Sequence, residues 1–389
     1  MATRGMNSEF QKRSNRGLAL RLVATGECRS RIELSRRMDL TKTTISVIVS
    51  ELLEKGYLIE TKPQTTGEPG PNPVGLAIGP GAPRYAGVLI QRGYAEAAVC
   101  DLTMKMTKYE RVERDWQSSD ELMEAVFRLL DHMLDGEEPP VSGIGVSSIG
   151  PVDVRTGRIL RPLYFGGIGD IDVTARIRER YGLPVYFDHD NQGAALVEYL
   201  FGGGKGFQDI LMIGVGRGVG CGIITRGRRV HSSTGYTPEI GHMSIDGRGR
   251  KCICGNVGCL ETYIMERVVE EAVEKAAGRA MNYREICLSA DDPAVDEVMR
   301  EMIENLSTAV VSLLNILNFE VVLLNLDALL WPERYVALLE ERINERKFSR
   351  WEAHTLVRKA SFGERTQVLG AVCNAVYRCF EGDLPEGDW

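Results

Sequence analysis

The chain has 389 residues, of which 43% are hydrophobic and 26% are charged, and its formal net charge is −7. This composition is typical of a globular protein with two or three domains, and it excludes a largely disordered chain, a collagen-like rod and a coiled coil. Polar residues interrupt the most apolar stretch, residues 309–331, so we expect a buried helix and strand there and no membrane span. The polar N-terminal segment lacks the apolar core of a secretory signal, and we expect a cytoplasmic location.

The charge is unevenly distributed along the chain. Residues 1–60 contain 11 Lys and Arg against 7 Asp and Glu, whereas acidic residues outnumber basic ones in the remainder. A basic N-terminal segment on an acidic body is the asymmetry expected of a DNA-binding domain attached to a different kind of domain.

Three helices in succession are predicted within this basic segment. An apolar stripe marks the first over residues 17–26. Ser30 followed by Glu33 predicts a capping box that opens a second helix over residues 31–38. A threonine cap and a glycine bound the third helix, over residues 42–55.

Two short apolar segments, residues 57–59 and 74–78, predict a two-stranded wing after these helices. The turn-rich loop between them, residues 61–73, contains no arginine, so we do not expect it to enter the minor groove. Phosphate contacts are expected instead from one or another arginine of the helical segment: Arg13, Arg16 or Arg31.

The third helix carries the candidate DNA contacts. Its apolar residues recur at helical spacing and predict one buried face. Lys42, Thr43, Ser46 and Ser50 fall together on the other face, where their short donors and acceptors suit phosphates and base edges. The same periodicity would also be compatible with a three-helix dimerisation unit.

The rest of the chain predicts two α/β cycles. The first has three strands within residues 85–112, a helix over 119–134 and a strand over 141–146. The second has strands over 209–214 and 218–225, helices over 260–277 and 293–317, and a strand over 320–326. The repeated pattern predicts a duplicated α/β fold with two lobes.

Four potential metal ligands, His242, Cys252, Cys254 and Cys259, lie close together in the sequence. Three thiolates and one imidazole satisfy tetrahedral Zn²⁺, and because protein would fill all four positions, the site would be structural rather than catalytic. The alternatives are a redox pair or chance clustering. The other six cysteines are scattered through mostly apolar stretches, and we expect them to be reduced core residues.

These residues also carry a family resemblance. Glu239-Ile-Gly-His242, followed by the pattern CxCGxxGCxE at 252–261, resembles the signature of the ROK family, which contains bacterial sugar kinases and sugar-responsive transcriptional repressors. The resemblance covers essentially the whole chain and includes Gly150-Pro151-Val152-Asp153, Leu183-Pro184-Val185-Tyr186 leading into His189-Asp190, and the glycine stretch 216–220. It implies a two-lobed, actin-like (ribonuclease H-like) body. The family's kinases usually lack a winged-helix segment, whereas its repressors have one.

The resemblance implies a sugar site in this body. Asp190 matches the carboxylate that contacts the sugar and that serves, in the kinases, as general base. Glu239, His242 and Glu261 match further sugar contacts, with His242 also a metal ligand. His189 stands where typical kinases have Asn, and the His-Asp pair is similar to that of glucose and N-acetylglucosamine repressors. Considered without the resemblance, Glu239 could be a surface charge and Glu261 a helix N-terminal charge.

Two of the three nucleotide elements of the family's kinases are missing. The kinases begin the first lobe with an Asp-x-Gly-Gly-Thr turn, and the aligned stretch here is Leu89-Ile90-Gln91-Arg92-Gly93. A later Gly-Gly pair falls on Asn325-Leu326, and only the glycine stretch 216–220 is retained. Phosphoryl transfer needs backbone amides and a Mg²⁺-organising carboxylate around the phosphates. We therefore expect that the protein is not an enzyme.

The sequence thus predicts a sugar-responsive transcriptional regulator, a repressor of carbohydrate-metabolism genes. We expect a winged helix-turn-helix over residues 1–80, a first lobe over 81–200 completed by a C-terminal helix at 366–380, and a second lobe over 201–365 with structural zinc. A monosaccharide or sugar phosphate bound between the lobes would change their closure. That change would alter the spacing of two heads, in a homodimer or a dimer of dimers, on operator DNA.

Two other functions remain compatible with the sequence. The first is an active ATP-dependent sugar kinase with a regulatory DNA-binding head, which phosphoryl transfer to a hexose would reveal. The second is an interaction protein that another protein removes from DNA, which an operator complex insensitive to every monosaccharide would indicate.

Overall fold

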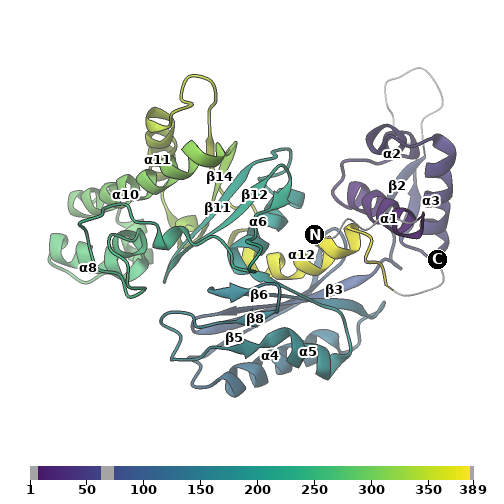
Figure 1. Ribbon diagram of the computed structural model, residues 1–389, viewed down its shortest axis with the longest axis horizontal. Coiled ribbons are helices and arrows are strands. Elements are labelled where there is room, and N and C mark those ends of the chain that lie inside the picture. Colours follow the sequence, from purple (N-terminus) through teal and green to yellow (C-terminus); the bar gives the residue numbers. More distant parts are fainter. Residues whose placement is uncertain (1–7, 63–73, 386–389) are drawn as a thin grey trace.

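The computed structural model describes residues 8–62 and 74–385, which form an N-terminal head and a two-lobed body (Figure 1). The head contains α1 (Ser8–Ala24), α2 (Arg31–Met38), α3 (Lys42–Glu54) and the antiparallel strands β1 (Leu58–Thr61) and β2 (Gly75–Ile78). This is the predicted arrangement of a winged helix-turn-helix, although α1 begins earlier than the predicted start at residue 17. Most of the predicted wing loop, residues 63–73, lies outside the described residues.

Side-chain caps begin both helices of the helix-turn-helix. The Ser30 hydroxyl accepts a hydrogen bond from the Glu33 N–H at 3.3 Å, and the Thr41 hydroxyl accepts one from the Thr44 N–H at 3.1 Å, as predicted. The Glu33 carboxylate, however, accepts from the N–H of Arg29, not of Ser30. The reciprocal half of the predicted capping box is therefore wrong, because the carboxylate reaches one residue further back along the chain.

Lobe one is built on a five-stranded sheet in the order β10-β6-β3-β4-β5. Its strands are β3 (Arg84–Gln91), β4 (Tyr94–Cys100), β5 (Met106–Glu113), β6 (Val141–Ser148) and β10 (Val185–His189). The first three form an antiparallel meander, and β6 and β10 run parallel to β3. The segment between β6 and β10 forms a separate small sheet of β7 (Val152–Asp153), β8 (Arg158–Ile159) and β9 (Ile171–Asp172).

The two faces of this sheet pack against different helices. Along β3, Ala86, Val88 and Ile90 belong to the core formed with α4 (Ser119–Leu134) and α5 (Val173–Tyr181). The alternate residues Tyr85 and Leu89 belong to a second core, formed with α12 (Thr366–Phe380). The alternation follows from strand geometry, because successive side chains point to opposite faces. A strand buried on both faces reads as a continuous apolar run, as β3 does.

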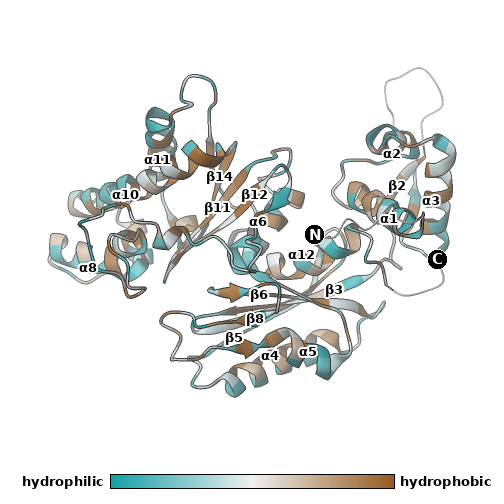
Figure 2. Cartoon of the chain, viewed as in Figure 1, coloured by the Kyte–Doolittle hydropathy of each residue, from teal (hydrophilic) through white to brown (hydrophobic). Residues whose placement is uncertain are grey.

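Lobe two repeats this pattern with the order β13-β12-β11-β14-β15. Its strands are β11 (Ile210–Val215), β12 (Val219–Thr225), β13 (Arg228–Arg229), β14 (Val321–Leu326) and β15 (Leu356–Lys359). Again one side of the sheet is antiparallel and the other parallel. Figure 2 shows that apolar residues concentrate on the central strands β11 and β14. The two sheets thus confirm the predicted duplicated α/β fold.

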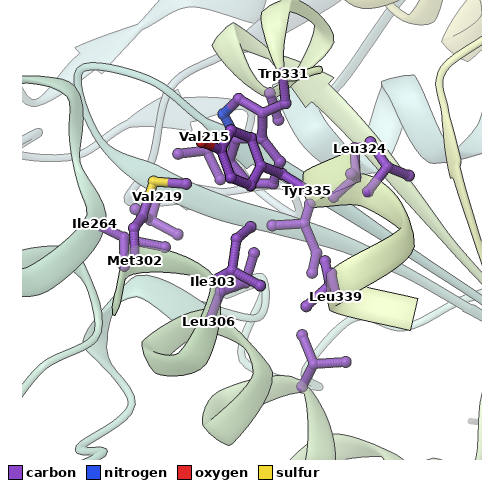
Figure 3. Packing of buried hydrophobic residues seen from close by; sticks show 14 of the residues in the cluster. Val215, Val219, Ile264, Met302, Ile303, Leu306, Leu324, Trp331, Tyr335 and Leu339 are labelled. Atoms are coloured by element: carbon purple, nitrogen blue, oxygen red, sulfur yellow. The ribbon is translucent and has the colours of Figure 1, made fainter. Parts of the chain in front are cut away.

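The helices of lobe two enclose a large apolar core. They are α7 (Glu261–Ile264), α8 (Glu266–Ala277), α9 (Tyr283–Leu288), α10 (Pro293–Leu317) and α11 (Glu333–Arg346). Trp331 and Tyr335 are fully buried at the centre of this core, against Met302 of α10 and the strand β14 (Figure 3). The predicted single helix over 260–277 is wrong, because Met265 takes an extended conformation and separates α7 from α8. Among the described helices, none combines the length and apolar character needed to cross a bilayer.

Helix α12 lies between the lobes and extends to the head (Figure 1). It packs on β3 and β6 of lobe one and crosses α6 (Asp190–Phe201), which covers a face of the lobe two sheet. Glycines allow these close approaches. A Cβ atom on Gly145 would lie 1.8 Å from the Ala371 carbonyl oxygen, and one on Gly370 would lie 2.5 Å from the Gly193 backbone. The helix backbone therefore rests directly on the sheet and on α6.

The head packs on the far end of α12. A Cβ atom on Gly17 of α1 would lie 2.6 Å from the carbonyl oxygens of Cys379 and Phe380. Arg13 donates to the carbonyl oxygens of Gly382 and Leu384, each at 3.2 Å. Buried side chains of the head, of α12 and of the lobe one sheet belong to one continuous apolar cluster. The head is therefore fixed to the body by core packing and not only by the linker.

We expect Gly145→Ala to lower the free energy of unfolding by about 1–3 kcal/mol or more, because the added methyl overlaps the Ala371 carbonyl in a close-packed core. Urea unfolding measures this change. Gly247→Ala is the control, since a Cβ atom at Gly247 has no neighbour within 4 Å among the described atoms. Equal stability of the two variants would contradict the close contact.

Candidate functional site

A cavity of about 570 Å³ lies between the two lobes. Its lobe one wall comes from the end of β3 and from the junction of β10 with α6, and its lobe two wall comes from the glycine stretch 216–220 and the end of β14. The four residues predicted to contact a sugar, Asp190, Glu239, His242 and Glu261, all line it. This volume falls within the usual range of small-molecule sites. The fold therefore brings together residues that are up to 71 positions apart in the sequence.

Asp190, the first residue of α6, is 3% exposed, and amide groups hold both of its carboxylate oxygens. Its Oδ1 accepts from the backbone N–H of Asn191 at 2.6 Å and from the Asn191 side chain at 2.9 Å. Its Oδ2 accepts from the Gln91 amide at 2.5 Å and from the Gln367 amide at 3.2 Å. These bonds fix the orientation of the carboxylate at the cavity wall.

Gln91 and Gln367 were not identified from the sequence as parts of the site. Gln91 stands at a glycine position of the kinase turn, and its side chain occupies the space that the glycine would leave. Gln367 and Asn374 are 3% and 2% exposed and lie seven residues apart on one face of the otherwise apolar α12. Two buried amides at helical spacing in an apolar helix are a sequence signal that could have located them.

Glu239 and Glu261 face the same cavity from lobe two. Burial, together with the nearby carboxylates of Asp190 and Glu261, raises the pKa of Glu239. A Cβ atom on Gly150 would lie 2.6 Å from Glu239 Oε1 and 3.0 Å from His189 Nε2, so only glycine leaves room for both groups there. Glu261 accepts a bond from the Val219 N–H at 3.3 Å. The three carboxylates offer acceptors suited to vicinal hydroxyl groups.

Arg92 lies at the cavity wall and interacts electrostatically with these carboxylates. Burial lowers its pKa, although Glu261, Asp190 and Glu239 favour its charged form. Its Nε donates to the carbonyl oxygen of Leu163 at 2.9 Å, which fixes the guanidinium in the cavity. A guanidinium here offsets part of the negative charge that the carboxylates place in a partly buried space.

The four predicted metal ligands converge beside the cavity. The ring nitrogen of His242 and the sulfurs of Cys252, Cys254 and Cys259 all lie within 4.8 Å of one another. His242 Nδ1 is 3.7 Å from Cys252 Sγ, and Cys254 Sγ is 3.7 Å from Cys259 Sγ. Zn–S bonds of 2.3 Å in a tetrahedron separate the sulfurs by about 3.8 Å, so these residues fit the ion. All nine cysteines lie in the described part of the chain, and all are free thiols.

The chain around this cluster also carries two of the carboxylates predicted to contact a sugar. Glu239 directly precedes the short helix η1 (Ile240–His242), and Glu261 follows Cys259 by two residues. Gly258 adopts φ +73°, and a Cβ atom there would lie 1.8 Å from the Asp246 carbonyl oxygen. The loop is therefore tightly folded, and a metal held by the cluster would fix both carboxylates through the backbone.

The chain matches the ROK family over residues 85–376, which is the body without the head. The chain belongs to the ROK family.

The match to individual ROK proteins extends through the head as well. The chain is 25% identical to the DNA-binding transcriptional repressor Mlc of Escherichia coli (strain K12) over 94% of each chain. It is 25% identical to a xylose repressor of Caldicellulosiruptor bescii over 95% of this chain and 97% of that one. The crystal structure of a ROK family transcriptional regulator, a homologue of E. coli Mlc, aligns with a TM-score of 0.81 at 22% identity, covering 96% and 98% of the two chains. The likeness to that structure confirms the fold.

At the lobe two wall of the cavity, side chains at the end of β14 crowd Gly214 and Gly216. Leu326 adopts φ +59° and ψ −133°, a strained conformation that glycine adopts without cost. A Cβ atom on Gly214 would lie 3.0 Å from Leu326 Cδ1, and one on Gly216 would lie 2.9 Å from Asp327 Oδ2. A leucine thus stands at the second position of the Gly-Gly pair of the kinases, and the neighbouring Asp327 carboxylate lies beside Gly216.

The predicted DNA contacts share one exposed face of α3. Lys42, Thr43, Ser46 and Ser50 are all exposed. Val47, which the sequence analysis did not single out, lies on this face and is 54% exposed. An exposed valine among short polar side chains is suited to contact with a thymine methyl group.

The arginines expected to contact phosphates are differently placed. Arg16 is 4% exposed and donates to Glu51 at 2.8 Å, so its prediction as a phosphate contact is wrong. Its position on α1 faces the core between α1 and α3, not the outer surface. Arg13 is bonded to the segment after α12, and Arg31 pairs with Glu60 at 3.0 Å on the surface.

Burial, with a further contribution from Glu266, raises the pKa of Asp327 from 3.8 to about 6. The folded state binds this proton more tightly than the unfolded state does. Protonation of Asp327 therefore contributes to the free energy of unfolding in full below pH 4, and this contribution is lost as pH rises through 6. We expect Asp327→Asn to raise the free energy of unfolding at pH 8 by on the order of 1–3 kcal/mol and to have little effect at pH 4. Thermal unfolding across this range measures the change.

Asp291→Asn is the control, since the Asp291 side chain is 99% exposed. Asp291→Asn should change the free energy of unfolding by a similarly small amount at pH 4 and at pH 8. A pH-independent effect of Asp327→Asn would contradict a raised pKa at Asp327.

Proposed function

We propose that this protein is a sugar-responsive transcriptional repressor of carbohydrate-metabolism genes. The head would read operator DNA through Lys42, Thr43, Ser46 and Ser50 of α3. A monosaccharide or a sugar phosphate would bind in the cavity between the lobes. The proposal rests mainly on the contacts of α12, which touches the candidate sugar site at one end and the head at the other.

The cavity chemistry supports a polyhydroxylated ligand. Asp190, Glu239 and Glu261 converge on one space, and each offers oxygens that accept from hydroxyl groups. Asp190 would contact the ligand from lobe one and Glu239 from lobe two. A ligand that bonds both would stabilise one inter-lobe arrangement, and this differential contact is the requirement for a ligand-driven change.

The same cavity argues against phosphoryl transfer. The stretch 89–93 contains no carboxylate and one glycine, where the family's kinases have an Asp-x-Gly-Gly-Thr turn. Leu326 and Asp327 fill the approach to the glycine stretch and add negative charge where phosphates would bind. We propose that the protein binds sugar without phosphorylating it.

Helix α12 supplies the route between sugar and DNA. Gln367 contacts Asp190, and Asn374 bonds to both lobes, donating to Ser147 Oγ at 3.1 Å and accepting from Arg229 at 2.9 Å. At its other end the helix contacts Gly17 of α1. A change in lobe closure would therefore move α12 relative to one of its partners, and with it the head.

The His-Cys₃ cluster would hold one structural Zn²⁺. All four positions of the tetrahedron would be protein ligands, so the ion would supply no open coordination site for chemistry. Its contribution would be to fold the loop that carries Glu239 and Glu261. We further propose that the protein is located in the cytoplasm. We also propose that it assembles as a homodimer or dimer of dimers, since helix-turn-helix heads read paired half-sites.

The proposal is tested by titrating selected operator DNA with the full chain, with and without each member of a sugar panel. The panel contains glucose, xylose, N-acetylglucosamine and their phosphates. We expect one of them to lower DNA affinity by roughly 5–150-fold. Glu239→Gln should abolish this response and keep ligand-free DNA affinity near wild type, whereas Lys42→Ala should weaken DNA binding and reduce the log–log salt slope by about 1.

Gly17→Ala tests the route through α12. The added methyl separates α1 from α12, so sugar binding should be unchanged while the sugar effect on DNA affinity falls below about twofold. Gly247→Ala is again the control. An undiminished sugar effect in Gly17→Ala would exclude α12 as the route, and a DNA affinity insensitive to the whole panel would contradict the proposed function.

For the metal, we expect about one zinc ion per chain in protein purified without chelators, and near-complete loss in Cys254→Ser. Elemental analysis measures the content, and thermal unfolding should show a lower midpoint for the variant. Cys287→Ser, a buried cysteine of the same lobe outside the cluster, should retain the ion. Zinc-free wild-type protein would refute the assignment.

A further inference from the structure

Helix α6 leads from the candidate sugar site towards the head. It begins with Asp190 at the cavity wall and ends at Phe201, and a helix of these 12 residues is about 18 Å long. The loop that follows, residues 202–206, precedes the central strand β11 of lobe two. From this loop Lys205 reaches the head, where its Nζ donates a hydrogen bond to the carbonyl oxygen of Thr25. The bond joins residues 180 positions apart in the sequence.

The acceptor of this bond is suited to a cation. Thr25 directly follows α1, and its N–H donates to the Arg21 carbonyl oxygen at 2.9 Å, so its own carbonyl group belongs to the C-terminal end of that helix. Carbonyl groups at this end lack partners within the helix and carry a partial negative charge. An ammonium group satisfies one of them and interacts favourably with the helix dipole. The contact lies at the start of the turn that leads from α1 into α2.

A buried carboxylate fixes the loop that carries Lys205. Glu198 of α6 is fully buried, and its Oε2 accepts from the Gly203 N–H at 2.7 Å. Its Oε1 accepts from the N–H groups of Ser361 and Phe362, at 2.6 and 3.2 Å, in the turn after β15. Bonds from backbone N–H groups to a carboxylate are among the strong hydrogen bonds of a protein. They hold the loop to α6 and to the β15 turn, so Lys205 moves with lobe two.

The head is thus held from two sides. Its helix α1 packs on α12, which rests on β3 and β6 of lobe one, and Lys205 adds a contact from lobe two. A segment held by one body moves with that body. A segment held by two bodies must respond when they move relative to each other, because close-packed contacts do not stretch.

We propose that Lys205 is a positioning residue of the sugar response, through which lobe two holds the head. A sugar-driven change in lobe closure would move Lys205 relative to Thr25 and so change the orientation of the head on DNA. Helix α12 would supply the support from lobe one, and both contacts would be needed. This inference rests on the proposed function, because it concerns how the response to sugar reaches the operator.

The test compares Lys205→Met with wild type in operator titrations of the full chain, with and without the sugar of the panel that acts on wild type. We expect the sugar effect on DNA affinity to fall below about twofold, with sugar affinity in the absence of DNA unchanged. Because coupling is reciprocal, the effect of operator DNA on sugar affinity should fall by the same factor. Lys205→Arg keeps the cation and should retain an effect of at least about fivefold.

Lys275→Met is the matched control, since Lys275 is an exposed lysine on α8 of the same lobe and its loss changes the net charge equally. It should leave the sugar effect unchanged. A direct phosphate contact of Lys205 would have a different signature: Lys205→Met would reduce the log–log salt slope by about 1 and keep the sugar effect. That signature, or an equal loss of the sugar effect in Lys275→Met, would overturn the proposal.

A second measurement needs no sugar. The N–H groups of Gly26 and Cys28 donate to carbonyl oxygens of α1 at 3.0 and 2.9 Å, in the turn beside the contact. Their hydrogen exchange in the full chain should be at least about threefold faster in Lys205→Met than in wild type, and unchanged in Lys275→Met. Equal exchange in all three proteins would show that Lys205 does not hold the head, and would overturn the proposal.

The outcomes separate this inference from the proposed function. A wild type that responds to no sugar of the panel would contradict the proposed function as a whole. A wild-type response that persists in full in Lys205→Met would contradict the role of Lys205 alone.

Discussion

The arrangement of this protein depends on the burial of one helix against three partners. Helix α12 fills the space between the lobes, where its backbone rests on glycines of the sheet and of α6, and its far end supports the head. Its few polar side chains are used at specific points: Gln367 fixes Asp190, and Asn374 bonds to both lobes. Because close-packed interfaces have discrete arrangements and do not deform continuously, such a helix would transmit a change in lobe closure as a rigid element, as we propose.

The cavity between the lobes is lined by three carboxylates suited to hydroxyl groups, and two glutamines donate to one oxygen of Asp190. Leu326 keeps a backbone conformation that favours glycine, and such conformations cost on the order of 1–3 kcal/mol each. The strand end has therefore retained its path although the residue that made this path favourable has been replaced.

Local signals accounted for most of what the sequence predicted correctly. Caps and periodicity located α2, α4 and α10 at their observed bounds, and ligand spacing located the His-Cys₃ cluster. The capping-box error is local, because the Glu33 carboxylate accepts from the Arg29 N–H. Other failures depend on packing between distant segments. Arg16 was read as a surface cation, but it is buried beside α3, and Gln91 was noted only for the glycine that it replaces. The break between α7 and α8 at Met265 follows from lobe two packing. No Pro or Gly in the sequence indicates this break.

The contact between α1 and the segment after α12 also sets an order of events during synthesis. The bond from Arg13 to Gly382 joins residues 369 positions apart, so the ribosome completes the head long before its support exists. Until then the apolar side of α1 that packs on α12 stays exposed, and closing such long-range contacts is slow. The nascent head is therefore a segment that chaperones and proteases can reach, and the synthesis of α12, long after α1, decides when that exposure ends.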